Sequence, residues 1–265
     1  MIRSNWNWLA ALFLAMTIAG CGGGGGGQPA TEQPAGGAAA PAAPAATATV
    51  DPATAATITG KVAFTGQAPN RLRIRMDAVP ACTQANPEPV FVQDVVVNDN
   101  KTLANVFVYV KEGLGDRSFP PASPEAVIDQ HGCMYRPHVL GLVVGQKLRI
   151  KNSDSTNHNI HPLPKENREW NQSQPPGSAD MMQEFARPEI MIPVKCNVHP
   201  WMISYIGVLR HPFFAVSGAD GSFEIKGLPP GNYVIEAWHE KFGTFQQNVT
   251  VGASETKQVD FSIQG

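Results

Sequence analysis

Short stretches of alternating apolar and polar residues dominate the chain after about residue 57. They are rich in β-branched and aromatic residues, and Gly, Pro, Asn and Asp separate them, as is typical of strands joined by turns. The stretches are TITGKVAFTG (57–66), NVFVYVKEG (105–113), HVLGLVVGQKLRIKNSD (138–154), IMIPVKCNV (190–198), MISYIGVL (202–209), GSFEIKGLPPGNYVIEAW (221–238) and NVTVGASETKQVDFSI (248–263). No stretch has the periodicity of a long amphipathic helix. The pattern predicts an all-β protein, built as a sandwich or a barrel.

The first residues have a different composition. MIRSNWNW carries one arginine and precedes the apolar run LAALFLAMTIAG, which predicts a secretory signal over residues 1–20. The run ends in Ile18-Ala19-Gly20-Cys21, which resembles a bacterial lipobox. That resemblance implies cleavage before Cys21 and a lipid anchor on its side chain. An ordinary secretion signal followed by an unrelated cysteine is the alternative.

Residues 21–56 are rich in Gly, Ala and Pro. They contain almost no large apolar side chains, so they cannot bury a core of their own. As a random coil such a segment spans about 30 Å. We expect a tether that holds the folded part close to a membrane of the cell envelope, facing the periplasm or the exterior, and leaves it free to search for a partner.

Length and charge narrow the classes of function. The chain has 265 residues, which suits one large or two small domains. Its formal net charge of −2 provides no general attraction to nucleic acid, so we expect no nucleic-acid partner. Chemistry is therefore expected at specific sites.

Three cysteines follow the predicted anchor, at Cys82, Cys133 and Cys196. An exported protein usually pairs its thiols, and three is an odd number. A disulfide between Cys82 and Cys133 would leave Cys196 single, as a metal-bound thiolate requires. A free thiol or an intermolecular bridge is the alternative.

The segment CNVHPWM places three soft or borderline ligands at three-residue steps, at Cys196, His199 and Met202. A thiolate, an imidazole and a thioether together suit a soft transition metal, above all copper. A mononuclear blue copper site needs a second imidazole, and NSDSTNHNIH (152–161) offers His158 and His161. Zinc is the alternative metal, although a thioether is a poor ligand for it.

The two motifs, in this order, resemble those of the cupredoxins, the blue copper proteins of the amicyanin and plastocyanin type. HNIH at 158–161 and the Cys-x2-His-x2-Met loop, with a proline after its histidine, carry the resemblance. It covers roughly residues 125–210 and implies a Greek-key cupredoxin domain with one type 1 copper. The copper ligands that it implies are His158, Cys196, His199 and Met202.

The same resemblance implies roles for residues beside the ligands. Asn159 would brace the loop that holds the cysteine. Val198 stands where amicyanin-type loops often have proline, so its backbone N–H could point at the sulfur and raise the reduction potential. The ring edge of His199 would reach the surface, with Pro200 and Trp201 beside it, as an apolar patch where redox partners dock transiently.

The remaining histidines are less favoured as metal ligands. An auxiliary role for His161 stays open. His131, Cys133 and His138, in HGCMYRPH (131–138), form a second candidate cluster. A disulfide between Cys82 and Cys133, beside ordinary histidines, explains that segment better.

The C-terminal part carries a second resemblance. SGADGSFEIKGLPPGNYVIEAW (217–238) is similar to the carboxypeptidase regulatory-like, or transthyretin-like, β-sandwich. Its Asp-Gly and Pro-Gly pairs offer the backbone conformations that tight turns need. Such sandwiches usually begin with strands like those at 58–66 and 103–111. The sandwich could therefore be split by the copper-type segment; a cupredoxin followed by a separate sandwich is the alternative.

Taken together, these features predict five segments: a lipoprotein signal peptide (1–20), a lipid-anchored tether (21–56), N-terminal strands (57–124), a cupredoxin domain (125–210) and a regulatory-like sandwich (211–265). They predict a carrier of single electrons between a donor and an acceptor protein, and not an enzyme, because a four-ligand copper site has no open position for a substrate. Copper storage or delivery, a copper enzyme such as a nitrite reductase with further histidine ligands, and a structural or carbohydrate-binding sandwich are the alternatives.

Overall fold

The computed structural model describes residues 48–121 and 123–265. These residues form two β-sandwiches, and their sheets do not close into barrels, which confirms the predicted all-β fold and selects the sandwich. In this described part, no helix has the length and apolar character needed to cross a membrane. The predicted signal peptide, Cys21 and most of the predicted tether lie outside the described residues.

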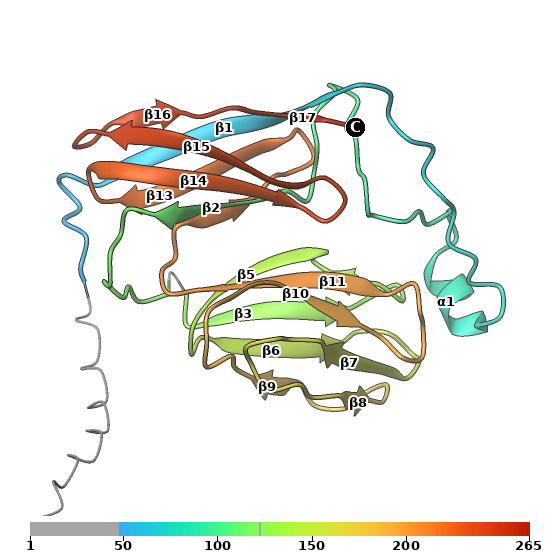
Figure 1. The fold of residues 1–265 in the computed structure, drawn as a ribbon. Helices are drawn as coiled ribbons and strands as arrows, with labels where there is room; N and C mark the ends of the chain where they lie inside the picture. Colours follow the sequence, from blue (N-terminus) through green and yellow to red (C-terminus); the bar gives the residue numbers. More distant parts are fainter. Residues whose placement is uncertain (1–47, 122) are drawn as a thin grey trace, which may run out of the picture. The chain divides into compact units, whose positions relative to one another are not determined.

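The first sandwich combines strands from both ends of the described chain, and we call it the split sandwich. Its strands are β1 (Ala56–Thr65), β2 (Phe107–Glu112), β12 (Phe214–Val216), β13 (Ser222–Leu228), β14 (Gly231–His239), β15 (Gly243–Val251), β16 (Thr256–Gln258) and β17 (Phe261–Gln264). One sheet has the order β13–β1–β16, with β17 also paired to β1, and the other has the order β12–β2–β14–β15. In Figure 1 the blue strand β1 accordingly lies among the orange and red C-terminal strands.

The second sandwich lies between β2 and β12 in the sequence, and we call it the inserted sandwich. Its strands are β3 (Glu125–Gln130), β4 (Tyr135–Arg136), β5 (Val139–Val143), β6 (Lys147–Asn152), β7 (His158–Pro162), β8 (Gln172–Gln174), β9 (Met181–Gln183), β10 (Glu189–Lys195) and β11 (Ile203–Leu209). One sheet has the order β5–β11–β10–β7–β8 and the other the order β4–β3–β6–β9. Of the two arrangements that the sequence left open, the sheets show the split one.

Strand β2 is buried on both faces because its sequence alternates valines with aromatic residues. Val108 and Val110 belong to the core of the split sandwich. Phe107 and Tyr109 point to the opposite face, where they join a cluster that includes residues of the inserted sandwich. Gly207 of β11 leaves room for this contact, since a Cβ there would lie 2.8 Å from the Phe107 ring. The aromatic positions of β2 thus pack the two sandwiches together.

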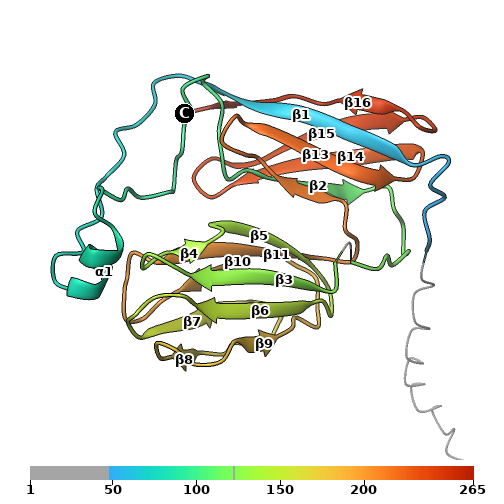
Figure 2. The same cartoon turned by 180° about the vertical axis from the view of Figure 1, so that it is seen from behind.

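Residues 72–92, between β1 and β2, pack on the inserted sandwich, and we call them the cap. The cap contains the short helix α1 (Pro80–Ala85). Backbone hydrogen bonds close it at its base: Ile74 N–H donates to Val90 O at 2.8 Å and Val92 N–H to Leu72 O at 2.9 Å. Figures 1 and 2 show α1 beside one end of the inserted sandwich. Three cap residues enter the core of that sandwich: Ile74, Met76 and Cys82.

A disulfide between Cys82 and Cys133 ties α1 to the loop after β3, which confirms the pairing predicted from the sequence. Both cysteines are completely buried. The Asn86 side chain reinforces the link, because its Nδ2 donates to Gly132 O at 2.8 Å. Among the described residues, Cys196 is the cysteine left free.

Candidate metal centre

Strand register brings the predicted ligands to one end of the inserted sandwich. Strands β10 and β11 are antiparallel, and Lys195 opposite Ile203 is their last pair, so residues 196–202 form the loop between them. Strand β7 is antiparallel to β10, with His161 opposite Lys195. His158, at the start of β7, is therefore placed beside that loop.

His158, Cys196 and His199 form a buried cluster whose ligand atoms all lie within 4.8 Å of one another. The Nδ1 atoms of the two histidines are 2.9 Å apart. Nδ1 of His199 is 3.9 Å from Sγ of Cys196. The three residues are 0%, 2% and 1% exposed. Met202, the fourth predicted ligand, is fully buried in the same core as Cys196 and donates its N–H to His199 O at 2.9 Å.

The donor set fits copper. Two imidazoles, a thiolate and a thioether are the ligands of four-coordinate copper sites that transfer electrons. The two Nδ1 atoms face each other, and only one proton can lie between them. A metal ion held by His158, Cys196 and His199 would instead satisfy the lone pairs of both nitrogens.

A carboxylate, not singled out from the sequence, supports His158. Asp154 Oδ2 lies 2.8 Å from Nε2 of His158. The backbone N–H groups of Gly132 and Cys133 also donate to this carboxylate, each at 2.7 Å. Burial raises the pKa of Asp154, but the hydrogen bonds from His158 and these two amides outweigh burial, so the pKa lies below its usual range. Asp154 stands four residues before His158, in the turn that ends β6.

The electrostatics at Cys196 and His199 favour the protonation states that a metal needs, whereas at His158 burial lowers the pKa but the hydrogen bonds and charges of Asp154 and Cys196 outweigh it, so the pKa is raised. Burial raises the pKa of the Cys196 thiol. Hydrogen bonds from His158 and from backbone N–H groups outweigh burial, so the pKa lies below its ordinary value. Burial also lowers the pKa of His199, and the nearby His158 adds to this effect. A thiolate and a neutral imidazole are the forms that bind metal ions.

Asn159 organises the ligand loop. Its Oδ1 accepts the N–H of Asn197 at 2.7 Å and that of Val198 at 3.3 Å, and the Cys196 thiol donates to the same oxygen at 3.4 Å. The His199 N–H donates to the Cys196 sulfur at 3.4 Å. The Val198 N–H is shared: it donates to Asn159 Oδ1 at 3.3 Å, and its hydrogen bonding to the sulfur also helps to lower the pKa of the Cys196 thiol, while its effect on the reduction potential stays a prediction.

The ring of His199 does not reach the surface, in contrast to the expectation from the sequence. The residue is 1% exposed, because the cap covers it and Cys82 Sγ lies 3.6 Å from its Nε2. Trp201 lies between His199 and the surface. Its ring centroid is 5.2 Å from that of His199, and its side chain is partly exposed. The indole Nε1 donates to Cys133 O at 3.0 Å, and Pro200 beside it is exposed.

The other histidines that the sequence raised lie outside the cluster. His161 contacts Glu169, with 2.7 Å between Nε2 and Oε1. His138 is buried against the Glu240 carboxylate at 2.5 Å. His131 is exposed. In the described residues, no group of side chains that could hold a metal contains His131 or His138, and Cys133, which belongs to two such groups, is in the disulfide with Cys82.

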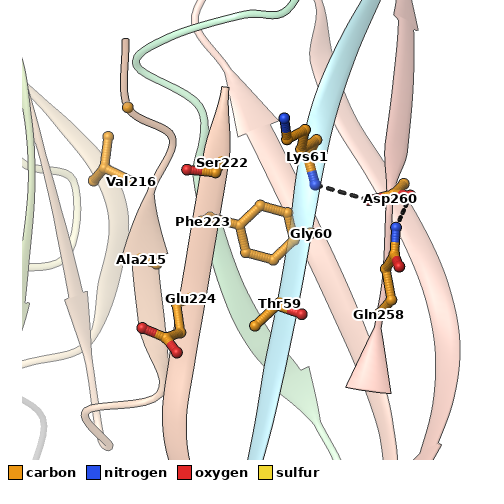
Figure 3. Close-up of a pocket in the computed structure, with 11 residues that line it drawn as sticks. Thr59, Gly60, Lys61, Ala215, Val216, Ser222, Phe223, Glu224, Gln258 and Asp260 are labelled. Carbon is orange, nitrogen blue, oxygen red and sulfur yellow. Dashed lines mark hydrogen bonds between the residues drawn. The ribbon is translucent and has the colours of Figure 1, made fainter. Parts of the chain in front are cut away.

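A shallow hollow of about 630 Å³ lies on the split sandwich (Figure 3). The ring of Phe223 lies over Gly60, where a Cβ would be 2.7 Å from the ring. Asp260 accepts hydrogen bonds from the Lys61 N–H at 2.8 Å and from Gln258 Nε2 at 2.7 Å. The Asp260 carboxylate in the hollow is thus already occupied by neighbouring groups of the same sandwich.

Comparison with protein families supports the second resemblance that the sequence predicted. Residues 210–264 match the carboxypeptidase regulatory-like domain family. This match covers β12 to β17, the C-terminal strands of the split sandwich. A comparison with curated protein sequences finds no match.

Cupredoxins are among the solved structures that resemble part of the chain. A Cu-containing nitrite reductase from Thermus scotoductus SA-01 is 18% identical over 32% of this chain, with a TM-score of 0.30. The match spans only 22% of that enzyme. A purple cupredoxin from Nitrosopumilus maritimus is 22% identical over 31% of this chain and 98% of its own, with a TM-score of 0.27. An oxidized mutant of amicyanin is 21% identical over 33% of this chain and 84% of its own, with a TM-score of 0.28.

Proposed function

We propose that the protein is a mononuclear type 1 copper protein that carries single electrons between redox partners at the cell envelope. The observation that carries this proposal is the buried cluster of His158, Cys196 and His199, with Met202 at the end of the same loop. Copper held by these four side chains would supply a centre that is oxidised and reduced by one electron.

The surrounding residues support rapid electron exchange. Asp154 and Asn159 fix the outer sides of the histidine and the loop through hydrogen bonds. The cap and its disulfide keep water from His199. A centre held so firmly changes little between oxidation states, which favours electron transfer. Four protein donors leave no position for a substrate, so we propose a carrier rather than an enzyme.

Because His199 is buried, we propose that partners dock at Trp201 instead. This side chain touches the His199 ring and is partly exposed. Val198, which is 48% exposed, and Pro200 add apolar surface on the same loop. A small apolar contact of this kind suits partners that must bind briefly and separate.

The proposed location rests on the lipobox-like residues Ile18 to Cys21 and on the tether that follows. Lipid on Cys21 would hold the protein at a membrane, facing the periplasm or the exterior. Labelling of cells with a radioactive fatty acid tests this: the wild-type chain should incorporate the label and Cys21→Ala should not. Equal labelling of both chains would contradict the anchor.

Visible absorption and electron paramagnetic resonance test the copper site in the full chain, purified in detergent and given one equivalent of Cu(II). We expect an intense thiolate-to-copper band and a narrow hyperfine splitting. Cys196→Ser and His158→Ala should abolish both signals, whereas His161→Ala, a change on the same strand outside the cluster, should keep them. A colourless protein or an ordinary tetragonal copper signal would contradict the proposal and favour zinc binding or copper storage.

A further inference from the structure

We propose that Asp154 is a positioning residue of the metal centre, which orients His158 toward the metal and stabilises the oxidised state of the bound copper. The inference rests on the proposed function, because it concerns the same centre. Asp154 is not one of the predicted ligands. It contacts His158 on one side and the backbone of Gly132 and Cys133, beside the disulfide, on the other.

The carboxylate of Asp154 is held in place from three sides. Its Oδ1 accepts the Gly132 N–H, and its Oδ2 accepts both the Cys133 N–H and the Nε2 of His158. The side chains of Asp154 and His158 are 4% and 0% exposed. With two amides fixing the carboxylate in a buried place, it cannot turn away from the imidazole, and water cannot replace it.

This contact selects one tautomer of His158. An ionised carboxylate only accepts hydrogen bonds, so Nε2 of the imidazole must carry the proton. In the neutral imidazole, which is the form that binds a metal, Nδ1 then keeps its lone pair, and Nδ1 is the atom that faces His199 at 2.9 Å. The hydrogen bond from Nε2 to Asp154 therefore leaves Nδ1 available as the metal ligand.

The negative charge of Asp154 also distinguishes the two oxidation states. A carboxylate on the outer nitrogen makes the imidazole a stronger donor. Its attraction is larger for Cu(II) than for Cu(I), and burial weakens the screening of that attraction. The outer nitrogen of His199 differs, because it contacts the uncharged disulfide sulfur of Cys82 at 3.6 Å. Asp154 thus lowers the reduction potential through one of the two histidines.

The reduction potential of Asp154→Asn, measured by voltammetry on the copper-loaded full chain, tests this role. We expect the affinity for Cu(II) to fall at least about tenfold relative to that for Cu(I). A tenfold change raises the potential of a one-electron couple by about 59 mV. Glu169→Gln is the matched control, because it removes a carboxylate that lies 2.7 Å from the Nε2 of His161, a histidine of the same strand outside the cluster. We expect this control to leave the potential nearly unchanged.

The wild-type protein supplies a second test that does not depend on a variant that folds. Nitrogen-15 NMR of the Cu(I)-loaded chain should show a protonated, strongly hydrogen-bonded Nε2 on His158. An unprotonated Nε2 would overturn the proposed orientation.

The outcomes separate this inference from the function on which it rests. A wild-type protein without a type 1 copper spectrum would overturn both. A wild-type protein with that spectrum, combined with equal potentials for Asp154→Asn and Glu169→Gln, would overturn the role of Asp154 alone. A higher potential for Asp154→Asn only would support it.

Discussion

Removal of the Cys82–Cys133 disulfide tests how strongly the cap is held over the candidate centre. We expect Cys82→Ala combined with Cys133→Ala to lower the free energy of unfolding by about 4 kcal/mol. Alanine is the suitable replacement, because both cysteines are completely buried and serine would place an additional hydroxyl among apolar side chains.

The magnitude follows from the length of the closed loop. The two cysteines are 51 residues apart in the sequence. A cross-link over that separation removes about 14 cal/mol/K of entropy from the unfolded chain, which is about 4 kcal/mol at 25 °C. The loop contains β2 of one sandwich and β3 of the other, so the cross-link restrains strands from both.

Urea denaturation of the full chain, followed by circular dichroism and extrapolated linearly to water, measures this loss. Each single variant, Cys82→Ala or Cys133→Ala, already breaks the bond, so their losses should not add, and the double variant should have a free energy of unfolding close to that of either. Dithiothreitol should destabilise the wild type and leave the double variant unchanged. A double variant within about 1 kcal/mol of the wild type would contradict the predicted contribution of the disulfide. Diethyl pyrocarbonate should also label His199 faster once the cap is released.

Other residues allow further tests. Trp201→Ala should slow electron exchange with a small redox protein more than Trp201→Phe, which keeps an aromatic ring on His199; stopped-flow rates that are equal for both would contradict the docking proposal. Burial lowers the pKa of His211 and of His239 to about 4, from an ordinary value of 6.5. The unfolded chain therefore binds more protons than the folded one between these values, and the free energy of unfolding should fall as the pH decreases from 6.5 to 4, by up to about 3 kcal/mol for each histidine. Urea titrations at pH 7 and 4.5 measure this, and equal stability at both would contradict it. Gly60→Ala should cost at least about 2 kcal/mol, because its Cβ would lie 1.9 Å from the backbone carbonyl oxygen of Val259, between β16 and β17. A melting temperature as high as that of Gly218→Ala, at a site with no contact closer than 3.6 Å, would be inconsistent with this clash.

The sequence alone determined the elements whose signal is local. Alternation of apolar and polar residues has the period of a strand, so it predicted an all-β chain without any knowledge of the partners of each strand. The loop from Cys196 to Met202 was recognisable because a single hairpin turn carries three of its candidate ligands. His158 followed from a second local motif, HNIH.

Tertiary structure decided what covers these elements. His199 is buried by Cys82, which is 117 residues away in the sequence. The residues on either side of His199 in the sequence give no indication of that contact. The anchoring of Asp154 likewise depends on backbone amides of a different loop, at Gly132 and Cys133. Periodicity reports which face of a strand avoids water, but not which distant segment excludes the water. The candidate cluster of His158, Cys196 and His199 was therefore predictable, whereas the cap that covers it and the Asp154 carboxylate beside it required the folded chain.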